Sequence, residues 1–446
     1  MRPYHVAIVG SGPSGFFAAA SLLKSEYDVR VDMLEMLPTP WGLVRSGVAP
    51  DHPKIKSISA QFDKIAADPH FRFFGNITVG GHVQATELAE RYDAVIYAIG
   101  AQADRVLGIP GEELPGSVAA VDFVGWYNAH PHFQHMTLDL SADRAVVIGN
   151  GNVALDVARI LISDPDILAQ TDIADHALDS LAPRGVREVI VVGRRGPLQA
   201  PFTTLELREL GHLEAMAEVD VVVERADFEH ITEEELEASD KTVRQNVKVL
   251  RGYAENEPSG VTRRIVFRFS TSPIEIRGDG RVESIVLGRN ELVNEGGRVV
   301  AKDTGEREEL PVQLVVRAVG YRGVATPGLP FDERSGTIPH TDGRIEGSRN
   351  EYVVGWIKRG PSGVIGSNKK DSADTVKTLL ADVKEPGFDD GYADELVEWL
   401  VSRQPLLVTD DHWQRIDSHE RATGDAQHRP RVKLTSVAEM LGIAHG

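Results

Sequence analysis

The chain has 446 residues, 41% hydrophobic and 26% charged, which is the composition of an ordinary globular protein long enough for two or three domains. Its formal net charge of −19 argues against broad nucleic-acid binding. The absence of cysteine excludes disulfides, thiolate metal sites, cysteine-ligated iron–sulfur clusters and a redox-active Cys-x-x-Cys pair.

The first predicted element is a buried strand at Val6–Val9, followed by a glycine-rich turn and an alanine-rich helix. Three glycines have the G-x-G-x-x-G spacing of a dinucleotide-binding turn: Gly10, Gly12 and Gly15, with Pro13 and Ser14 between them. A second strand, Val29–Leu34, ends at Glu35, where a ribose-binding acid belongs, while the rival acid Asp32 lies inside the strand. The alternative interpretation is a tight turn beside a solvated glutamate.

A proline-rich segment follows, and it is predicted to be a shaped loop rather than a helix. Residues 38–53 have the pattern Pro-x-Pro-x-Gly-Leu-Val-Arg-x-Gly-Val-Ala-Pro-Asp-His-Pro. This pattern resembles the flavin loop of adrenodoxin-reductase-type ferredoxin–NADP reductases, and it is most similar to that of the mycobacterial members. The stretch from Trp413 to Leu434 also resembles the family, so the resemblance covers nearly the whole chain.

Helical periodicity predicts a helix at Ser57–Ala67, and strands are expected within Phe71–Val83 and at Tyr92–Gly100. In this part of the chain the resemblance implies that four residues contact a cofactor: Gly42, Leu43, Val83 and Arg105. It also implies that His52 lies near the nicotinamide, as a catalytic candidate. Taken alone, Val83 would be a core valine, Arg105 a solvated charge and His52 a solvated loop histidine.

A second dinucleotide-binding motif spans Ala145–Leu161, where a buried strand leads into a G-x-G-x-x-A turn. The motif positions are Gly149, Gly151 and Ala154. The resemblance implies that this turn holds NADP through Asn152, Val153, Ala154 and Leu155. Two complete motifs in one chain indicate two nucleotides on two similar domains.

The strand Val189–Val192 is followed by Arg194 and Arg195 rather than by an acid. An arginine pair attracts the 2′-phosphate of NADP and could favour NADPH over NADH by about 10²–10⁴. Arg194 lies further from Ala154 than the roughly 20 residues of the simple motif, and residues 163–185 are expected to form an inserted helix and loop. The alternative is two solvated arginines.

Further along, the resemblance implies an NADP contact at Glu206 and a catalytic candidate, Glu209, near the nicotinamide. Four basic residues recur at helical spacing and are expected to share one face: Lys241, Arg244, Lys248 and Arg251. This face could dock an acidic ferredoxin, or it could be a solvated face that balances nearby acids.

Short strands at Arg264–Phe269, Ile274–Ile276, Val282–Leu287 and Arg298–Ala301 are predicted to form an antiparallel insert. Leu314–Gly320 is interpreted as the return to the first domain. A strand at Tyr352–Trp356 and a helix at Ser372–Asp382 flank a glycine-rich turn. There the resemblance implies flavin contacts from Trp356, Gly363, Val364 and Ile365.

The sequence thus predicts two doubly wound, Rossmann-like α/β domains, the second inserted in the first. The resemblance implies an FAD-binding domain at 1–102 and 321–446 around an NADP-binding domain at 103–320. It also implies a reaction in which NADPH passes a hydride to FAD and single electrons go on to a ferredoxin.

The alternatives that remain open are an NADPH diaphorase acting on quinones and a non-catalytic NADPH sensor. A subunit feeding a larger enzyme is disfavoured, because such subunits carry a cysteine-rich cluster domain. A strand pattern near residue 5 leaves no room for a signal peptide, and no apolar run reaches the about 18 residues of a membrane span. We therefore expect a cytoplasmic protein without a membrane span.

Overall fold

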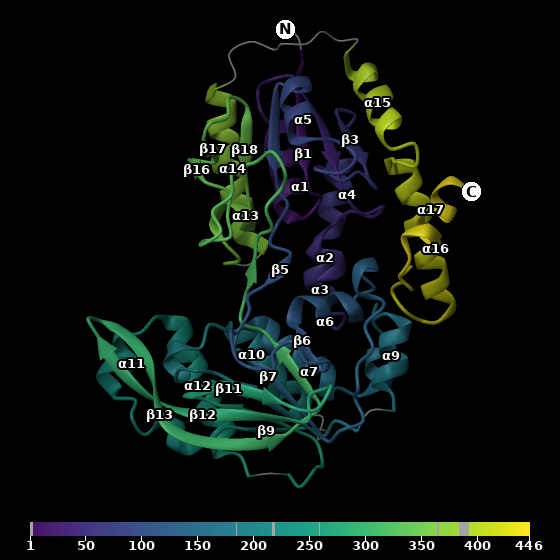
Figure 1. Cartoon of the computed structure of the whole chain (residues 1–446). Helices are drawn as coiled ribbons and strands as arrows, with labels where there is room; N and C mark the ends of the chain where they lie inside the picture. Colours follow the sequence, from purple (N-terminus) through teal and green to yellow (C-terminus); the bar gives the residue numbers. More distant parts are fainter. Residues whose placement is uncertain (1–2, 184, 216–218, 258, 364, 383–391) are drawn as a thin grey trace. The chain divides into compact units, whose positions relative to one another are not determined.

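The structure is a computed structural model that describes residues 3–446 apart from 184, 216–218, 258, 364 and 383–391. Its contacts divide the chain into two compact units. Unit 1 comprises residues 1–103, 128–131 and 320–446, and unit 2 comprises residues 104–127 and 132–319. Figure 1 shows both units coloured along the sequence.

Unit 1 is built on a sheet in the order β16-β17-β18-β4-β1-β2-β3, in which β18, β4, β1, β2 and β3 run parallel. The parallel strands are β1 (Tyr4–Val9), β2 (Val29–Leu34), β3 (Phe71–Phe74), β4 (Ala94–Tyr97) and β18 (Glu351–Val353). The strands β16 (His340–Thr341) and β17 (Arg344–Ile345) form an antiparallel edge.

Both faces of this sheet are covered, which explains the continuous apolar runs of its strands. Val6 and Ile8 of β1 belong to one core cluster, while Ala7 and Val9 belong to the other. The first cluster contains residues of α1 (Pro13–Leu23), α4 (Ser59–Ala66), α14 (Ile365–Asp382), α16 (Asp410–Ala426) and α17 (Val437–His445). The second contains residues of α5 (Ala85–Arg91) and α15 (Tyr392–Arg403).

Unit 2 is built on a six-stranded parallel sheet in the order β6-β14-β7-β8-β10-β9. Its strands are β6 (Ser117–Ala119), β7 (Arg144–Ile148), β8 (Glu188–Val192), β9 (Asp220–Val222), β10 (Arg264–Arg268) and β14 (Leu314–Arg317). A separate antiparallel sheet consists of β11 (Thr271–Arg277), β12 (Ser284–Glu295) and β13 (Arg298–Pro311).

The antiparallel sheet covers one face of the parallel sheet, because residues of β11 and β12 share a core cluster with residues of β7 and β8. The longer helices of unit 2 are α6 (Ala120–Tyr127), α7 (Asn152–Ile162), α9 (Asp175–Leu181), α10 (Thr204–Ala215), α11 (Glu233–Ala238) and α12 (Lys241–Glu255). Short elements are β5 (Ala103–Asp104), η1 (Pro131–Phe133), α8 (Pro165–Leu168), η2 (Pro197–Gln199), η3 (Arg225–Phe228), β15 (Tyr321–Arg322) and α13 (Trp356–Arg359). The predicted fold class, with one α/β domain inserted in another, is confirmed.

Three predictions about single elements were wrong. The proline-rich loop contains two one-turn helices, α2 (Leu43–Ser46) and α3 (Pro53–Lys56), the second starting with a proline at its first position. The strand β10 pairs in parallel with β8 and β9 rather than within the antiparallel insert. The stretch that ends at Val83 forms a strand only at β3 and then continues as turns.

The search for membrane spans was limited to the part of the chain that the structure describes. None of the helices there combines enough length with enough apolar character to cross a bilayer.

Candidate functional site

In unit 1, the turn between β1 and α1 is closely packed except at its middle glycine. Gly10 has φ +102°, and a Cβ there would lie 2.5 Å from the carbonyl oxygen of Ala98. A Cβ on Gly15 would lie 2.2 Å from the carbonyl oxygen of Gly10. A Cβ on Gly12 would meet no atom within 4 Å. The turn therefore leaves room beside Gly12, at the N-terminus of α1, where an anion is stabilised.

Glu35 follows β2, and its carboxylate is directed at this turn. One oxygen accepts hydrogen bonds from the backbone N–H and the hydroxyl of Ser11, at 3.0 and 2.6 Å. The other accepts the N–H of Leu37 at 3.1 Å. Asp32, by contrast, is paired inside the sheet with Arg72 at 2.7 Å and with the hydroxyl of Tyr92 at 2.8 Å. Of the two acids, Glu35 is the one beside the glycine turn.

The proline-rich segment contacts the same turn. Trp41 adopts φ +85° and donates its N–H to the carbonyl of Ser11 at 3.1 Å. A Cβ on Gly42 would lie 2.9 Å from the Cα of Gly12, so no larger residue fits at position 42 without a shift. Leu43, the next residue, begins α2 and is 40% exposed.

A second segment approaches the turn from the C-terminal part of unit 1. A Cβ on Gly355 would lie 2.3 Å from the hydroxyl oxygen of Ser14, and the hydroxyl of Ser372 donates to the Ser14 carbonyl at 2.9 Å. The neighbouring Trp356 is half-buried, and its indole Nε1 is buried without a hydrogen-bond partner among the residues that the structure describes.

The remaining residues predicted for unit 1 lie in several environments. Gly363 is exposed, Ile365 is half-buried at the start of α14, and Val364 lies outside the described residues. Val83 is fully buried, its carbonyl accepts the N–H of Gly80 at 2.7 Å, and its own N–H donates to the Thr78 carbonyl at 3.4 Å. His52 is 7% exposed and is the N-cap residue of α3.

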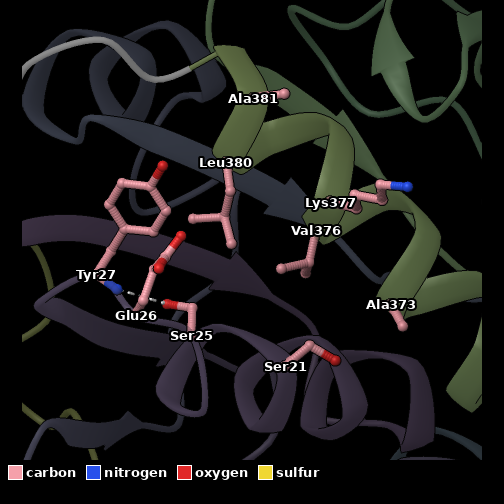
Figure 2. Close-up of a pocket in the computed structure, with 9 residues that line it drawn as sticks. All are labelled: Ser21, Ser25, Glu26, Tyr27, Ala373, Val376, Lys377, Leu380 and Ala381. Carbon is pink, nitrogen blue, oxygen red and sulfur yellow. Dashed lines mark hydrogen bonds between the residues drawn. The ribbon is translucent and has the colours of Figure 1, made fainter.

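A groove of about 390 Å³ lies between the C-terminal end of α1 and α14, as Figure 2 shows. It is lined by Ser21, Ser25, Glu26, Tyr27, Ala373, Val376, Lys377, Leu380 and Ala381. The glycine turn is at the opposite end of α1, an 11-residue helix about 16 Å long. This groove is therefore not part of the nucleotide turn.

In unit 2, the turn between β7 and α7 repeats the arrangement of the first turn. Gly149 has φ +120°, and a Cβ there would lie 2.2 Å from the carbonyl oxygen of Ala318. A Cβ on Gly151 would meet only the Pro201 side chain, at 3.8 Å. Ala154 and Leu155 are fully buried in α7, and Asn152 and Val153 are half-buried at its start. The Oδ1 atom of Asn152 accepts the N–H of Thr203 at 2.7 Å.

The arginine pair occupies the turn after β8. Arg194 is exposed and Arg195 is half-buried. Partial burial lowers the pKa of Arg195, and the positive charges of Arg194 and Arg298 lower it further. A nearby phosphate would relieve this repulsion.

A buried arginine of α7, which the sequence analysis missed, gathers three acids of unit 2. Arg159 is 3% exposed and donates to Asp156 at 2.7 Å. Its Nη1 lies 3.9 Å from a carboxylate oxygen of Glu206 and 3.7 Å from one of Glu209. Only the Asp156–Arg159 spacing of three helical positions was visible in the sequence.

The other predicted residues are divided between the units. Arg105 is exposed and lies in unit 2, as does Glu209, whereas His52 lies in unit 1.

Comparisons with known proteins agree with this geometry. The model of the pyridine nucleotide-disulphide oxidoreductases matches residues 4–249. The NADPH-ferredoxin reductase FprA of Mycobacterium tuberculosis is 69% identical over the full length of both chains. The chain belongs to the family of the NADPH-ferredoxin reductases.

A more distant relative in the reductase family is the mitochondrial NADPH:adrenodoxin oxidoreductase of Salvelinus fontinalis. It is 41% identical over 98% of this chain and 91% of its own. The solved structure of M. tuberculosis FprA in complex with NADPH superposes with a TM-score of 0.96 at 68% identity, covering both chains fully. The resemblance inferred from residues 38–53 is confirmed. The name of the broader family refers to disulphide chemistry, which needs a pair of cysteines in the enzyme. This sequence contains no cysteine.

Proposed function

We propose that the protein is an NADPH-ferredoxin reductase that holds FAD in unit 1 and NADPH in unit 2. The observation that carries this proposal is a pair of glycine turns whose neighbouring side chains have opposite charge. A carboxylate, Glu35, lies beside the first turn, and two guanidinium groups, Arg194 and Arg195, follow the strand next to the second. The FprA relative, which is named NADPH-ferredoxin reductase and has a structure with NADPH, supports the same assignment.

The residues of unit 1 fit FAD. The space beside Gly12 accommodates a pyrophosphate, and Gly42 keeps the adjacent loop close without filling that space. The Glu35 carboxylate has more acceptor sites than its three hydrogen bonds use, so it can also accept ribose hydroxyls. The buried Nε1 of Trp356 is a donor that a bound flavin can satisfy. We infer that the predicted contacts at Pro13, Ser14, Leu43, Val83 and 363–365 belong to this site.

The residues of unit 2 fit NADPH. Open space at Gly151 accommodates a pyrophosphate at the N-terminus of α7, and the arginine pair suits a 2′-phosphate. We infer that Glu206, Arg105 and residues 152–155 contribute further contacts. In domain terms, we propose FAD-binding parts at 1–102 and 321–446 and an NADP-binding part at 103–320.

Bound FAD supplies the chemistry, since it accepts a hydride from NADPH and releases electrons singly to an iron–sulfur cluster. The chain binds and orients the two nucleotides and excludes water. We infer that His52 and Glu209 orient the nicotinamide or hold a proton near it. The buried Arg159 helps to position the Glu209 side chain, because its guanidinium lies 3.7 Å from a Glu209 carboxylate oxygen.

For the ferredoxin partner we propose the basic face of α12 as a docking surface, consisting of Lys241, Arg244, Lys248 and Arg251. The first three are exposed. Arg244 also donates to the carbonyls of Glu237 and Ser239, and Arg251 lies 3.8 Å from Glu233 and over the ring of Phe228. Lys241 and Lys248 are therefore expected to contribute most. The cytoplasmic location stays a prediction.

Reduction of the reconstituted protein in a stopped-flow spectrophotometer tests the proposal. The protein loaded with FAD should be yellow, and NADPH should bleach it. NADPH should bind about 10²–10⁴ times more tightly than NADH. An oxidised ferredoxin should then restore the colour. Failure to take up FAD, or equal affinity for the two nucleotides, would contradict the proposal. Reoxidation by quinones but not by ferredoxin would favour the diaphorase instead.

A further inference from the structure

The turn that carries the arginine pair is held by the antiparallel sheet of unit 2. Three consecutive carbonyl groups of the turn each accept a hydrogen bond from this sheet or from Ser270, the residue just before β11. The Gly193 carbonyl accepts the N–H of Thr271 at 3.0 Å, and the Arg195 carbonyl accepts the N–H of Ser270 at 3.1 Å. Between them, the Arg194 carbonyl accepts the side-chain Nδ2 of Asn290 at 2.9 Å. The first two bonds come from backbone groups, so Asn290 is the donor whose presence depends on residue type.

Asn290 is well placed for this contact. It follows an irregularity in the pairing of β12 with β13, between Gly288 and Asn290, and such bulges redirect a side chain. Its backbone N–H donates to the Ser270 carbonyl at 2.7 Å, and Nδ2 also donates to the Ser272 hydroxyl at 2.8 Å. The side chain is 7% exposed. Because a carbonyl oxygen only accepts, the amide nitrogen must be the atom that faces Arg194.

Contacts from the antiparallel sheet, from β10 of the parallel sheet and from the link between β10 and β11 hold the rest of the turn. A Cβ on Gly196 would lie 3.1 Å from Leu292, two positions along β12 from Asn290. The N–H of Gly193 donates to the Arg268 carbonyl at 2.9 Å, at the end of β10. Ser270 adopts φ +50°, a conformation that a non-glycine residue keeps only when its surroundings hold it. The turn is therefore braced on both sides of Arg194.

The consequence concerns where the guanidinium groups point. A change in the backbone dihedral angles of the turn would re-aim the side chains of both arginines. The hydrogen bond from Asn290 to the Arg194 carbonyl opposes such a change. Two guanidinium groups bind a phosphate well only if their positions are set in advance. Binding of NADH, which has no 2′-phosphate, would not depend on the positions of these guanidinium groups.

We propose that Asn290 is a positioning residue that sets the preference for NADPH over NADH by holding the Arg194–Arg195 turn through the Arg194 carbonyl. The inference rests on the proposed function, since it requires that the two arginines bind the 2′-phosphate. It assigns a role to the antiparallel sheet, which touches this turn through β11 and β12.

The test compares the FAD-loaded full-length enzyme with N290L, which keeps a similar volume without a donor. We expect the KM for NADPH to rise about threefold to tenfold, the effect of one lost hydrogen bond, with kcat unchanged. The KM for NADH should stay within about twofold, by the same reasoning. Binding of 2′-phospho-AMP should weaken in parallel, while binding of AMP should not. Where N290L does not fold, N290A removes the same donor with less bulk.

Two controls separate the possible failures. N294L makes the same change on the exposed end of β12, where the Asn294 Oδ1 atom accepts the N–H of Gly297 within the hairpin, and it should leave both KM values unchanged. In an R194Q/R195Q background, N290L should have no further effect on the preference for NADPH, because the guanidinium groups that Asn290 positions are already absent. Equal rises for NADPH and NADH would overturn the proposal. If R194Q/R195Q itself keeps the preference for NADPH, the two arginines do not bind the 2′-phosphate, and that part of the proposed function is wrong.

Discussion

Asp32 and Glu35 are three residues apart, and the end of β2 separates their roles. Asp32 is inside the strand and is 2% exposed, with its charge balanced by Arg72. Glu35 follows the last strand residue, where side chains of parallel strands reach the carboxyl edge of the sheet at which such folds bind ligands. The position relative to the strand end therefore decides which acid can face a nucleotide.

In unit 2, the surroundings of Asp227 change the pKa of its carboxyl group. Partial burial and the charge of Glu224 raise the pKa of Asp227 to about 6, although Arg289 and Arg268 oppose them. In the unfolded chain it titrates near 3.8. The folded state therefore binds the proton more tightly, and the stability that this contributes is present below about pH 4 and is lost as the pH rises through about 6.

Replacing Asp227 by Asn removes this ionisation. We expect D227N to increase the free energy of unfolding at pH 8 by about 1 kcal/mol, a figure reduced for partial solvent screening, and to change it little at pH 4. Urea unfolding at the two pH values measures the difference. The exposed Asp279 is the control, and D279N should show no such pH dependence. A destabilised D227N at pH 8 would contradict the argument.

At the scale of elements, α16 holds the proline-rich segment through buried charges. Glu420 is fully buried and accepts two hydrogen bonds from Arg45 of α2, at 2.9 and 2.5 Å. Arg431 donates to Glu420 at 3.1 Å, and the rings of Trp41 and Trp413 meet edge to face at 5.1 Å. The segment that touches Gly12 is thus anchored by a helix almost 400 positions later in the sequence.

Removing the charge of Glu420 should be costly, because it leaves a buried Arg45 without its counterion. We expect E420Q to lower the free energy of unfolding by about 3 kcal/mol at pH 7, whereas D425N on the exposed side of α16 should have almost no effect. Burial raises the pKa of Glu420, but Arg45 and Arg431 outweigh it and the net shift is downward.

The pH dependence of the Glu420 effect has a definite sign. A lowered carboxyl pKa contributes stability above the unfolded value, near 4.5, and that stability is lost as the pH falls below it. The difference between wild type and E420Q should therefore shrink in acid. A constant difference from pH 7 down to pH 3 would show that the loss is not electrostatic.

At the scale of the whole molecule, a net charge of −19 opposes association with an acidic ferredoxin. Any such complex needs a local region of positive charge, and the face of α12 is one. We expect K241Q/K248Q to raise the KM for ferredoxin and to flatten its dependence on salt, with the rate of flavin reduction by NADPH unchanged.

The matched control for the docking surface is R251Q, on the same helix, because the Arg251 guanidinium already lies 3.8 Å from Glu233. It should change the ferredoxin KM less than K241Q/K248Q does. Steady-state kinetics at several ionic strengths measure both variants. If neither the KM nor its salt dependence changes in K241Q/K248Q, ferredoxin docks elsewhere.

The sequence by itself determined the two glycine turns, the strands before them, the fold class and the family. These features depend on residues close together in the chain: the spacing of Gly10, Gly12 and Gly15, the apolar runs of buried strands and the unusual pattern at 38–53. Local patterns suffice for them because each turn and each strand is formed by consecutive residues.

Only the tertiary structure decided which distant residues support the turns. Asn290, Arg159 and Glu420 look like ordinary polar residues in the sequence, since their partners are far away or on another element. Strand propensity likewise does not encode a partner, so β10 was predicted for the antiparallel insert although it pairs in parallel with β8. The physical reason is the same in each case: burial and pairing are set by neighbours in space, which the order of residues alone does not specify.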